Sequence, residues 1–171
     1  TKKELKYLFH ITHINNVSSI LKEGIYSHNK LNYKRDKPEA IYSPAVMDRR
    51  KEKLIDGNRS LWHFANLYFN PRNPMLYTLI NHVRAENLVI LAIDKNILTT
   101  EGVFISNGNA ANNDTNFVTS SHFKTAIPKV LKITDRKYWL QNDDSKREIM
   151  AEALIPSEIP PRYIKAIYVA N

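Results

Sequence analysis

The 171-residue sequence contains no cysteine, so neither a disulfide framework nor a thiolate metal site can form. This absence fits a reducing compartment. The chain also lacks the roughly 18–20 consecutive apolar residues that a membrane-spanning helix needs, and no apolar signal-type run follows its N-terminus. We therefore expect a cytoplasmic protein that does not contact a membrane.

The length and the hydrophobic content together predict one core. At 43% hydrophobic residues, 171 residues suffice for one compact domain and are few for two ordinary ones. We expect a single domain over residues 1–171, present as a monomer.

The charge balance favours a polyanionic partner. The chain has 25 Lys and Arg against 17 Asp and Glu, which gives a net charge of +8. Nucleic acid is the leading candidate for that partner. The basic residues are scattered rather than clustered, so a solubilising surface charge explains the same balance equally well.

Strand and helix patterns follow one another without the regular alternation of a doubly wound sheet. Apolar and β-branched runs predict strands at residues 5–12, 62–69, 88–93, 151–155 and 163–169. Cap signals predict helices that run from Asn15 or Asn16 to Gly24, from Ser43 toward Leu54, from Asn73 through Val83, and over residues 143–150. The expected fold class is α+β.

Two polar segments separate these elements. Residues 26–38 have no sustained apolar period and carry several basic side chains, which predicts a mobile basic loop. Residues 100–121 are rich in asparagine and other turn-forming residues, which predicts an irregular but ordered functional loop.

Glu152 is the acidic residue with the strongest reason for a role. It lies within the apolar run 151–155, where a carboxylate is costly unless it is paired or faces a cleft. The alternative is an acid on an edge strand that points into solvent, and the residues alone favour that alternative.

Histidine and arginine pairs give weaker signals. His10 and His13 have a spacing seen in metal sites, but at a strand end the two rings face different ways, and His10 fits better as a hydrogen-bonding residue at the mouth of a cleft. We expect no metal site. Arg49 and Arg50 can be solvated surface charge, or one of them can hold a diphosphate.

Four sequence blocks, in order, closely resemble the motif series of the DarT family of DNA ADP-ribosyltransferase toxins. The blocks are FHITHINN at residues 9–16, DRR at 48–50, LYFNPRNPMLY at 67–77 and AEALI at 151–155. They span nearly the whole chain, and one is eleven residues long. One such block alone would be weak support for a family assignment.

The resemblance implies an ADP-ribosyltransferase-like fold, a split and bent β-sheet with flanking helices and NAD bound between the two halves of the sheet. Glu152 matches the catalytic glutamate, and Arg50 matches a second catalytic residue that acts on the acceptor base. Positions that match the NAD pocket are His10, Thr12, Tyr42, Tyr68, Met75 and Tyr77. Aromatic residues at such positions are by default core residues.

The asparagine-rich loop corresponds to the part of the family fold that approaches the acceptor. Its expected DNA-binding residues are Asn107, Asn109, Asn112 and Asn113, with Arg49 beside them. In single-stranded DNA such side chains can read base edges, although asparagine also forms turns. Thymidine is the expected acceptor in preference to guanosine.

The resemblance thus implies a toxin that transfers ADP-ribose from its co-substrate NAD to single-stranded DNA. Its expected partner is a macrodomain antitoxin of the DarG type. Two other functions remain open: an NAD-dependent RNA 2′-phosphotransferase of the same fold, and a catalytically inactive nucleic-acid-binding module. The first would call for more conspicuous Arg and His clusters, and the second is disfavoured by the intact Glu152, His10 and Arg50.

Overall fold

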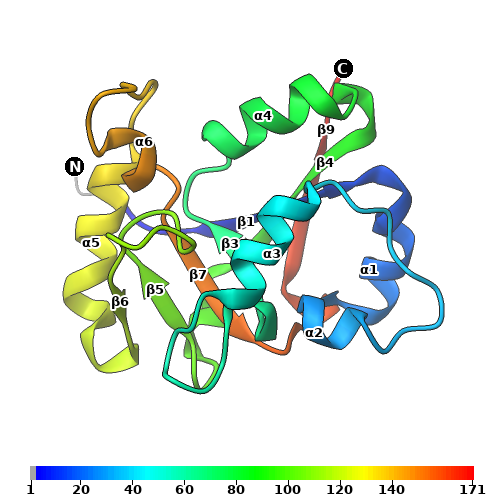
Figure 1. The fold of residues 1–171 in the computed structure, drawn as a ribbon, viewed down its shortest axis with the longest axis horizontal. Helices are drawn as coiled ribbons and strands as arrows, with labels where there is room; N and C mark the ends of the chain where they lie inside the picture. Colours follow the sequence, from blue (N-terminus) through cyan, green and yellow to red (C-terminus); the bar gives the residue numbers. More distant parts are fainter. Residues whose placement is uncertain (1–2) are drawn as a thin grey trace.

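The structure is a computed structural model that describes residues 3–171, and a seven-stranded antiparallel sheet forms its centre (Figure 1). The order of the strands across this sheet is β6-β5-β7-β3-β1-β4-β9. Their bounds are β1 Tyr7–His13, β3 Phe64–Tyr68, β4 Leu88–Asp94, β5 Phe104–Ser106, β6 Phe117–Val118, β7 Glu152–Pro156 and β9 Ile164–Val169. A second, two-stranded sheet joins β2 Ile25–Tyr26 to β8 Glu158–Ile159.

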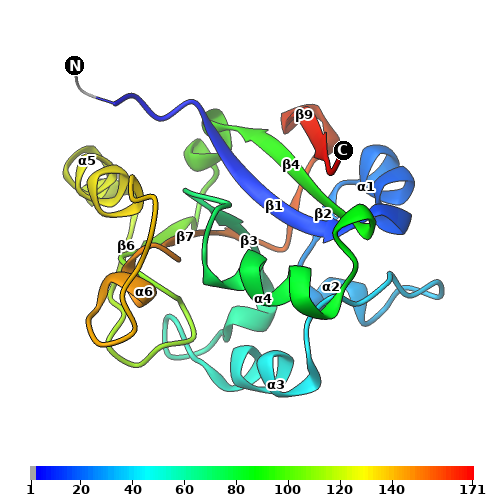
Figure 2. The same ribbon diagram turned by 90° about the horizontal axis from the view of Figure 1, so that it is seen from above.

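The large sheet is split between β1 and β3. β1 pairs with β4 at seven positions, from Tyr7 opposite Asp94 to His13 opposite Leu88. β1 and β3 share only one register pair, Phe9 opposite Tyr68, so the two halves of the sheet diverge from this point (Figure 2). This architecture confirms the α+β class and the split, bent sheet.

Helices flank the sheet and its two halves. The α-helices are α1 Val17–Glu23, α2 His28–Leu31, α3 Pro44–Glu52, α4 Pro74–His82, α5 Phe123–Thr134 and α6 Ser145–Glu148. Short 3-10 helices are η1 Ile14–Asn16, η2 Leu61–His63, η3 Ala85–Asn87, η4 Lys95–Thr99, η5 Ser120–His122 and η6 Pro161–Tyr163. In Figure 1, α5 lies beside β5 and β6, and α3 and α4 lie over the middle of the sheet.

The starts of α3 and α4 are determined locally. Ser43 accepts a hydrogen bond from the backbone N–H of Val46, and Asn73 accepts from those of Met75 and Leu76. A proline follows each cap at the first helical position, where its missing N–H costs no intrahelical bond. Both helix starts were predicted from the sequence.

Several predicted boundaries are wrong. Residues 62 and 63 of the expected strand 62–69 belong to η2, because Ser60 caps a helical turn through the N–H of Trp62. The segment 26–38, expected to be a loop, contains the end of β2 and all of α2, and the loop 100–121 contributes β5 and β6 to the sheet.

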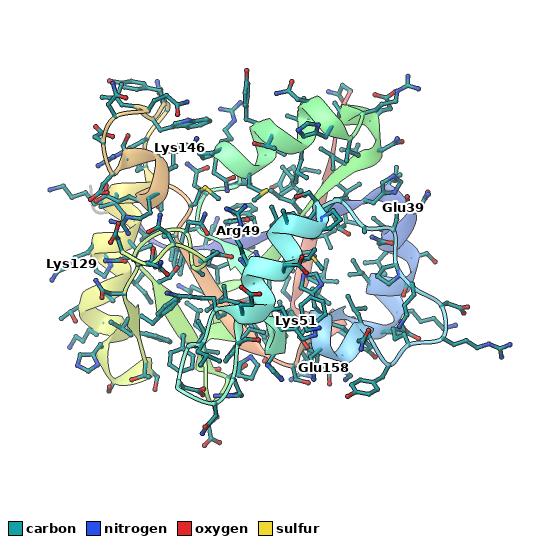
Figure 3. All side chains as sticks on the ribbon, viewed as in Figure 1. Glu39, Arg49, Lys51, Lys129, Lys146 and Glu158 are labelled. Carbon is teal, nitrogen blue, oxygen red and sulfur yellow. The ribbon has the colours of Figure 1, made fainter. Side chains whose placement is uncertain are left out.

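Asn16 precedes α1 as predicted, but its side chain makes no capping hydrogen bond. Its amide instead donates to the backbone carbonyl of Glu39 at 2.8 Å and accepts from the backbone N–H of Glu39 at 2.8 Å. The two bonds attach the segment between α2 and α3 to the start of α1. Figure 3 labels Glu39 in this segment.

Three apolar clusters surround the sheet. The largest covers one face under α1 and α5, and includes Leu8, Leu67, Leu91 and Leu131. A smaller cluster packs α4 against β1 and β3 through Ile11, Tyr68 and Leu79. The third lies under the asparagine-rich loop and includes Phe64 and Leu154. These clusters fix the strands and helices that carry the polar residues described next. Within residues 3–171, no helix is both long enough and apolar enough to cross a membrane.

Candidate active site

Glu152 lies at the centre of the sheet and is buried. It is the first residue of β7, which runs between β5 and β3, and it stands opposite Tyr68. Its exposed fraction is 1%. The expectation of an edge-strand acid that points into solvent is therefore wrong. A carboxylate this deeply buried must be stabilised by partners.

Three donors surround the Glu152 carboxylate. Oε1 lies 3.2 Å from a guanidinium nitrogen of Arg50 and accepts a hydrogen bond of 3.0 Å from the side-chain amide of Asn66. Oε2 accepts from the backbone N–H of Ala110 at 2.8 Å. The three donors together satisfy both oxygens of the buried carboxylate with charge-assisted or neutral hydrogen bonds.

Arg50 provides the counter-charge. It lies in the last turn of α3 and is 8% exposed. Burial is the largest single effect and lowers the pKa of Arg50, but the Glu152 carboxylate together with Tyr68 and Tyr42 outweighs it, so the pKa of Arg50 is raised. Arg50 is therefore a permanent cation in this site and cannot act as a resting base.

Ser106 attaches β7, the strand that begins at Glu152, to the asparagine-rich loop. The backbone N–H of Glu152 donates to Ser106 Oγ at 2.8 Å, and the Ser106 hydroxyl donates to the carbonyl of Gly108 at 2.7 Å. Ala110, whose N–H binds Glu152, lies in the same loop. The position of the carboxylate therefore depends on the conformation of residues 107–111.

Two cavities lie beside this cluster. The smaller, about 390 Å³, is lined by Arg49, Arg50 and residues of the asparagine-rich loop, and the larger, about 640 Å³, by His10, Thr12 and residues of the segment 23–42. Tyr42 and Asn66 line both. Glu152 lines neither cavity itself, but its partners Asn66 and Arg50 do: Asn66 lines both cavities, and Arg50 lines the smaller one.

His10 is held as a neutral ring in the wall of the larger cavity. Its Nδ1 lies 3.1 Å from the backbone carbonyl of Asn66, and because a carbonyl only accepts, Nδ1 carries the proton. Burial lowers the pKa of His10, and the bond to Asn66 offsets this only in part. The neutral ring leaves Nε2 as an acceptor.

His28 shares the larger cavity with His10. It stacks on Trp62 with ring centroids 5.1 Å apart. Burial, followed by the positive charge of Arg50, lowers the pKa of His28 to about 4. Both histidines that line this cavity are therefore uncharged at neutral pH.

The other residues predicted to bind NAD lie in four different places. Thr12 lines the larger cavity, Tyr68 and Met75 line the smaller one, and Tyr42 lies between the two. Burial raises the pKa of Tyr42 to about 12 and that of Tyr68 well above its ordinary value, so both phenols stay protonated. Tyr77 lies outside both cavities, is 64% exposed, and packs edge-on against Trp139.

Four of the five residues predicted to bind DNA line the smaller cavity. They are Arg49, Asn109, Asn112 and Asn113. Figure 3 labels Arg49 on α3. Asn107 lies outside this cavity: its Oδ1 accepts from the backbone N–H of Asn116 at 2.9 Å and holds the loop together.

The side-chain oxygens of the other asparagines are also engaged within the loop. Asn109 Oδ1 accepts from the N–H of Ala111 at 3.1 Å, and Asn112 Oδ1 accepts from the N–H of Asp114 at 2.8 Å. Both roles predicted for these asparagines are thus compatible. The oxygens form turns, whereas among the described contacts the amide nitrogens of Asn109 and Asn112 make no hydrogen bond within the chain.

Sequence reasoning missed Asn66, Ser106 and His28. Asn66 was detectable in principle, because it is a polar residue inside the apolar strand β3, as Glu152 is inside β7. Ser106 and His28 gave no such signal, since their roles arise from contacts across the fold. His13, half of the His-x-x-His pattern, caps η1 by accepting from the N–H of Asn15 at 3.0 Å. Over residues 3–171 there is no group of three or more His, Asp or Glu residues placed to hold a metal ion.

Comparison with known proteins places this site in a family. The model of the family described as "ssDNA thymidine ADP-ribosyltransferase, DarT" matches residues 9–171. A DNA ADP-ribosyl transferase–DNA ADP-ribosyl glycohydrolase fusion protein of Thermosipho africanus is 43% identical over 165 residues, which are 96% of this chain and 42% of the fusion protein. This chain thus spans less than half the length of that relative.

Solved structures show the same fold. Thermosipho africanus DarTG in complex with ADP-ribose is 42% identical with a TM-score of 0.91, over 97% of this chain and 44% of that one. DarT of Thermus sp. 2.9 is 20% identical. Its complex with ADP-ribosylated ssDNA has a TM-score of 0.85 over 100% of this chain and 84% of that one, and its complex with NAD+ has a TM-score of 0.77 over 100% and 85%.

Proposed function

Because the chain belongs to the DarT family of ssDNA thymidine ADP-ribosyltransferases, we propose that it transfers ADP-ribose from NAD to thymidine in single-stranded DNA and releases nicotinamide. The observation that carries this proposal is the Glu152 carboxylate, which is buried, bound by three donors and in contact with Asn66 and Arg50, which line the adjoining cavities.

The larger cavity is suited to NAD. Its polar wall holds Thr12 and the neutral His10, whose Nε2 can accept a hydrogen bond from a ribose hydroxyl. Its other side is formed by the segment 23–42, which Asn16 attaches to the core through Glu39. A preformed, half-enclosed cavity of this kind suits a dinucleotide better than a flat surface does.

The proposed reaction separates charge in a way that Glu152 can stabilise. Cleavage of the bond between nicotinamide and the ribose carbon C1′ gives a neutral leaving group and an oxocarbenium-like ribose. A carboxylate next to that ribose stabilises the developing cation and can accept a hydrogen bond from a ribose hydroxyl. The carboxylate requires no proton for this role, which agrees with its three donors.

The smaller cavity is suited to the acceptor base. Arg50 and the asparagine-rich loop form its walls and offer N–H donors to carbonyl groups on a base edge. In this arrangement Arg50 orients and polarises the base, because its permanent charge prevents it from accepting the ring proton. The base must leave a duplex stack to reach a ribose carbon between the cavities, and this favours a single strand.

The family assignment favours DNA modification over the alternative of RNA 2′-phosphate removal. Like the relative in which a transferase is joined to a DNA ADP-ribosyl glycohydrolase, the chain would act as a toxin with a macrodomain antitoxin that removes the modification. NAD and chromosomal DNA occur together in the cytoplasm, and we place the activity there.

The test compares Glu152→Gln with wild type on NAD and thymidine-containing single strands, with the adduct located by mass spectrometry. Gln keeps the size of the side chain and removes its charge, so transfer should fall by about 10³-fold or more. Glu101→Gln, a change at an exposed glutamate, is the matched control and should be silent. Near-normal transfer by Glu152→Gln would refute the assignment of Glu152. Wild type that releases nicotinamide but labels no DNA would refute the DNA-directed function.

A further inference from the structure

An aromatic pair, formed by the exposed Tyr77 and the half-buried Trp139, lies outside the two cavities and has no role in the site described so far. Tyr77 on α4 is 64% exposed, and its ring centroid lies 6.4 Å from that of Trp139 at an interplanar angle of 72°. Tyr138 and Leu140, the neighbours of Trp139 in the chain, are 73% and 55% exposed. Exposed aromatic side chains that gather at one place mark a binding surface.

Both halves of the pair are held by structured elements. Tyr77 stands one turn into α4, whose start is capped by Asn73. Trp139 lies between α5 and α6, where the backbone N–H of Leu140 donates to Ser145 Oγ at 2.8 Å. Arg136, three residues before Trp139, forms an ion pair of 3.1 Å with Glu148 of α6. The pair is thus preorganised, which reduces the entropy cost of binding a flat ligand.

The same elements border the smaller cavity. Met75, two residues before Tyr77, lines that cavity. On the other side, Arg147 of α6 supports the asparagine-rich loop: its guanidinium contacts Thr115 at 3.3 Å, and its carbonyl accepts from the N–H of Asn109 at 2.9 Å. The aromatic pair therefore joins α4 to the segment before α6, and both α4 and the loop that α6 supports contribute residues to the wall of the smaller cavity.

The charge on the α4 side of the pair suits a phosphate backbone, whereas residues 135–148 on the Trp139 side carry four basic and four acidic residues. From Arg72 to Arg84, the sequence that contains α4 has no acidic residue. Lys137 and Lys146 flank Trp139 in the sequence and, in the part of the chain that the structure describes, form no ion pair. Figure 3 labels Lys146 beside α6. Unpaired lysines around aromatic faces are the combination that proteins use to bind single strands.

We propose that Tyr77 and Trp139 stack a nucleotide base of the single-stranded DNA that flanks the modified thymidine. This inference rests on the proposed function and adds a second base-binding position to it. A single-stranded polyanion fits the surface better than a protein partner does, because α4 carries no acidic residue and, among the described residues, Lys137 and Lys146 form no ion pair. Stacking is tolerant of sequence, so this position would supply affinity and register without reading base identity.

The test measures binding of a short thymidine-containing single strand without NAD, so that no transfer occurs. One abasic site is moved through the positions on either side of the thymidine. In wild type, one flanking position should lower affinity about tenfold when its base is removed. In Tyr77→Leu/Trp139→Leu, the intact strand should bind about tenfold more weakly, and the abasic site should cause no further loss. Leucine keeps the apolar surface and removes the aromatic faces.

Tyr33→Leu is the matched control, because Tyr33 is 83% exposed and follows α2, which lies on the other side of the molecule from α6 in Figure 1. It should bind every strand as wild type does. NAD hydrolysis without DNA should be unchanged in the double variant. Wild-type affinity in the double variant, or an abasic penalty that persists in it, would overturn the proposal. So would a double variant that binds DNA normally but loses a partner protein. Wild type that binds the strand but never modifies it would refute the proposed function and leave the stacking result standing.

Discussion

At the scale of single residues, the Glu152–Arg50 pair combines catalysis and stability. Removing one member of a buried ion pair leaves the other charge without a partner. Glu152→Ala should therefore abolish transfer and also lower the free energy of unfolding by about 3 kcal/mol or more. Glu152→Gln keeps an acceptor oxygen and should lower the free energy of unfolding by less than Glu152→Ala does. Denaturant unfolding of both variants checks this, and equal stability of Glu152→Ala and wild type would show that the pair does not hold the fold.

His28 gives a prediction for pH. Its pKa of about 4 lies below the ordinary 6.5, so between these values the unfolded chain binds more protons than the folded one. The stability that this difference supplies is complete above about pH 6.5 and is lost as the pH falls toward 4. The shift corresponds to up to about 3 kcal/mol.

His28→Phe keeps an aromatic ring over Trp62 and cannot titrate. Its unfolding free energy should fall less than that of wild type between pH 6.5 and 4, with His10 still contributing in the same direction. His122→Phe, a change at an exposed histidine, is the control and should keep the wild-type slope. Identical pH profiles for His28→Phe and wild type would contradict the lowered pKa.

At the residue scale, the catalytic roles of Glu152 and Arg50 remain predictions. Glu152 and Arg50 were identified by resemblance, and the structure brings them together as an ion pair. Asn66 was missed: a polar residue in the apolar strand β3 was a signal, but the strand alone does not show that its partner is Glu152, which stands opposite Tyr68 and not opposite Asn66. Tyr77 was assigned to the NAD pocket together with Met75. Its ring lies instead on the outer surface of α4, where it is exposed.

At the scale of elements, α6 and the asparagine-rich loop form one unit. Asn107 Oδ1 accepts from the N–H of Asn116, and Arg147 lies 3.4 Å from the same oxygen. Asn107→Ala removes this acceptor, so hydrogen exchange in residues 107–116 should accelerate and the preference for DNA sequence should weaken. Asn107→Asp keeps the oxygen and should preserve both the slow hydrogen exchange and the preference for DNA sequence. Similar exchange rates in the two variants would refute the role of this oxygen in the loop.

Element boundaries could be predicted where a local cap sets them. They were predicted wrongly where contacts with the rest of the fold set them. The Ser-Pro and Asn-Pro starts of α3 and α4 needed only neighbouring residues. Residues 62 and 63 have the composition of a strand, but they belong to η2, which Ser60 caps. Helix α5 was not predicted and contains Pro128, a residue that usually ends a helix. β5 and β6 are short strands: β5 pairs with β7, and β6 pairs with β5.

At the scale of the whole molecule, the +8 charge predicts salt-sensitive binding of DNA. Single strands should bind better than duplex, and the logarithm of affinity should fall linearly with the logarithm of salt concentration, by about 0.7 per neutralised phosphate. Lys146→Gln should reduce that slope by about one phosphate contact. Lys129→Gln on α5, labelled in Figure 3, should leave it unchanged. A slope near zero would exclude contact with the phosphate backbone.

The order of the four motif blocks predicted the split, bent sheet. The strand and helix patterns without that resemblance predicted only the α+β class. The blocks lie in β1 and η1, in α3, across β3 and the start of α4, and in β7. They surround the point where the sheet splits. The split itself, a single register pair between β1 and β3, has no signature in either strand taken alone.

The wall of Tyr42 and Asn66 that the two cavities share has a consequence for how the two substrates influence each other. A ligand that fixes these side chains on one side changes the free energy of binding on the other, and thermodynamic linkage requires the effect to be reciprocal. We expect a non-hydrolysable NAD analogue to change the Kd for a single strand by about 5-fold or more, and the strand to change the Kd for the analogue by the same factor. Calorimetric titrations in both orders measure this factor. Asn66→Ala should bring it toward one, whereas a factor of one in wild type would mean that the two cavities fill independently.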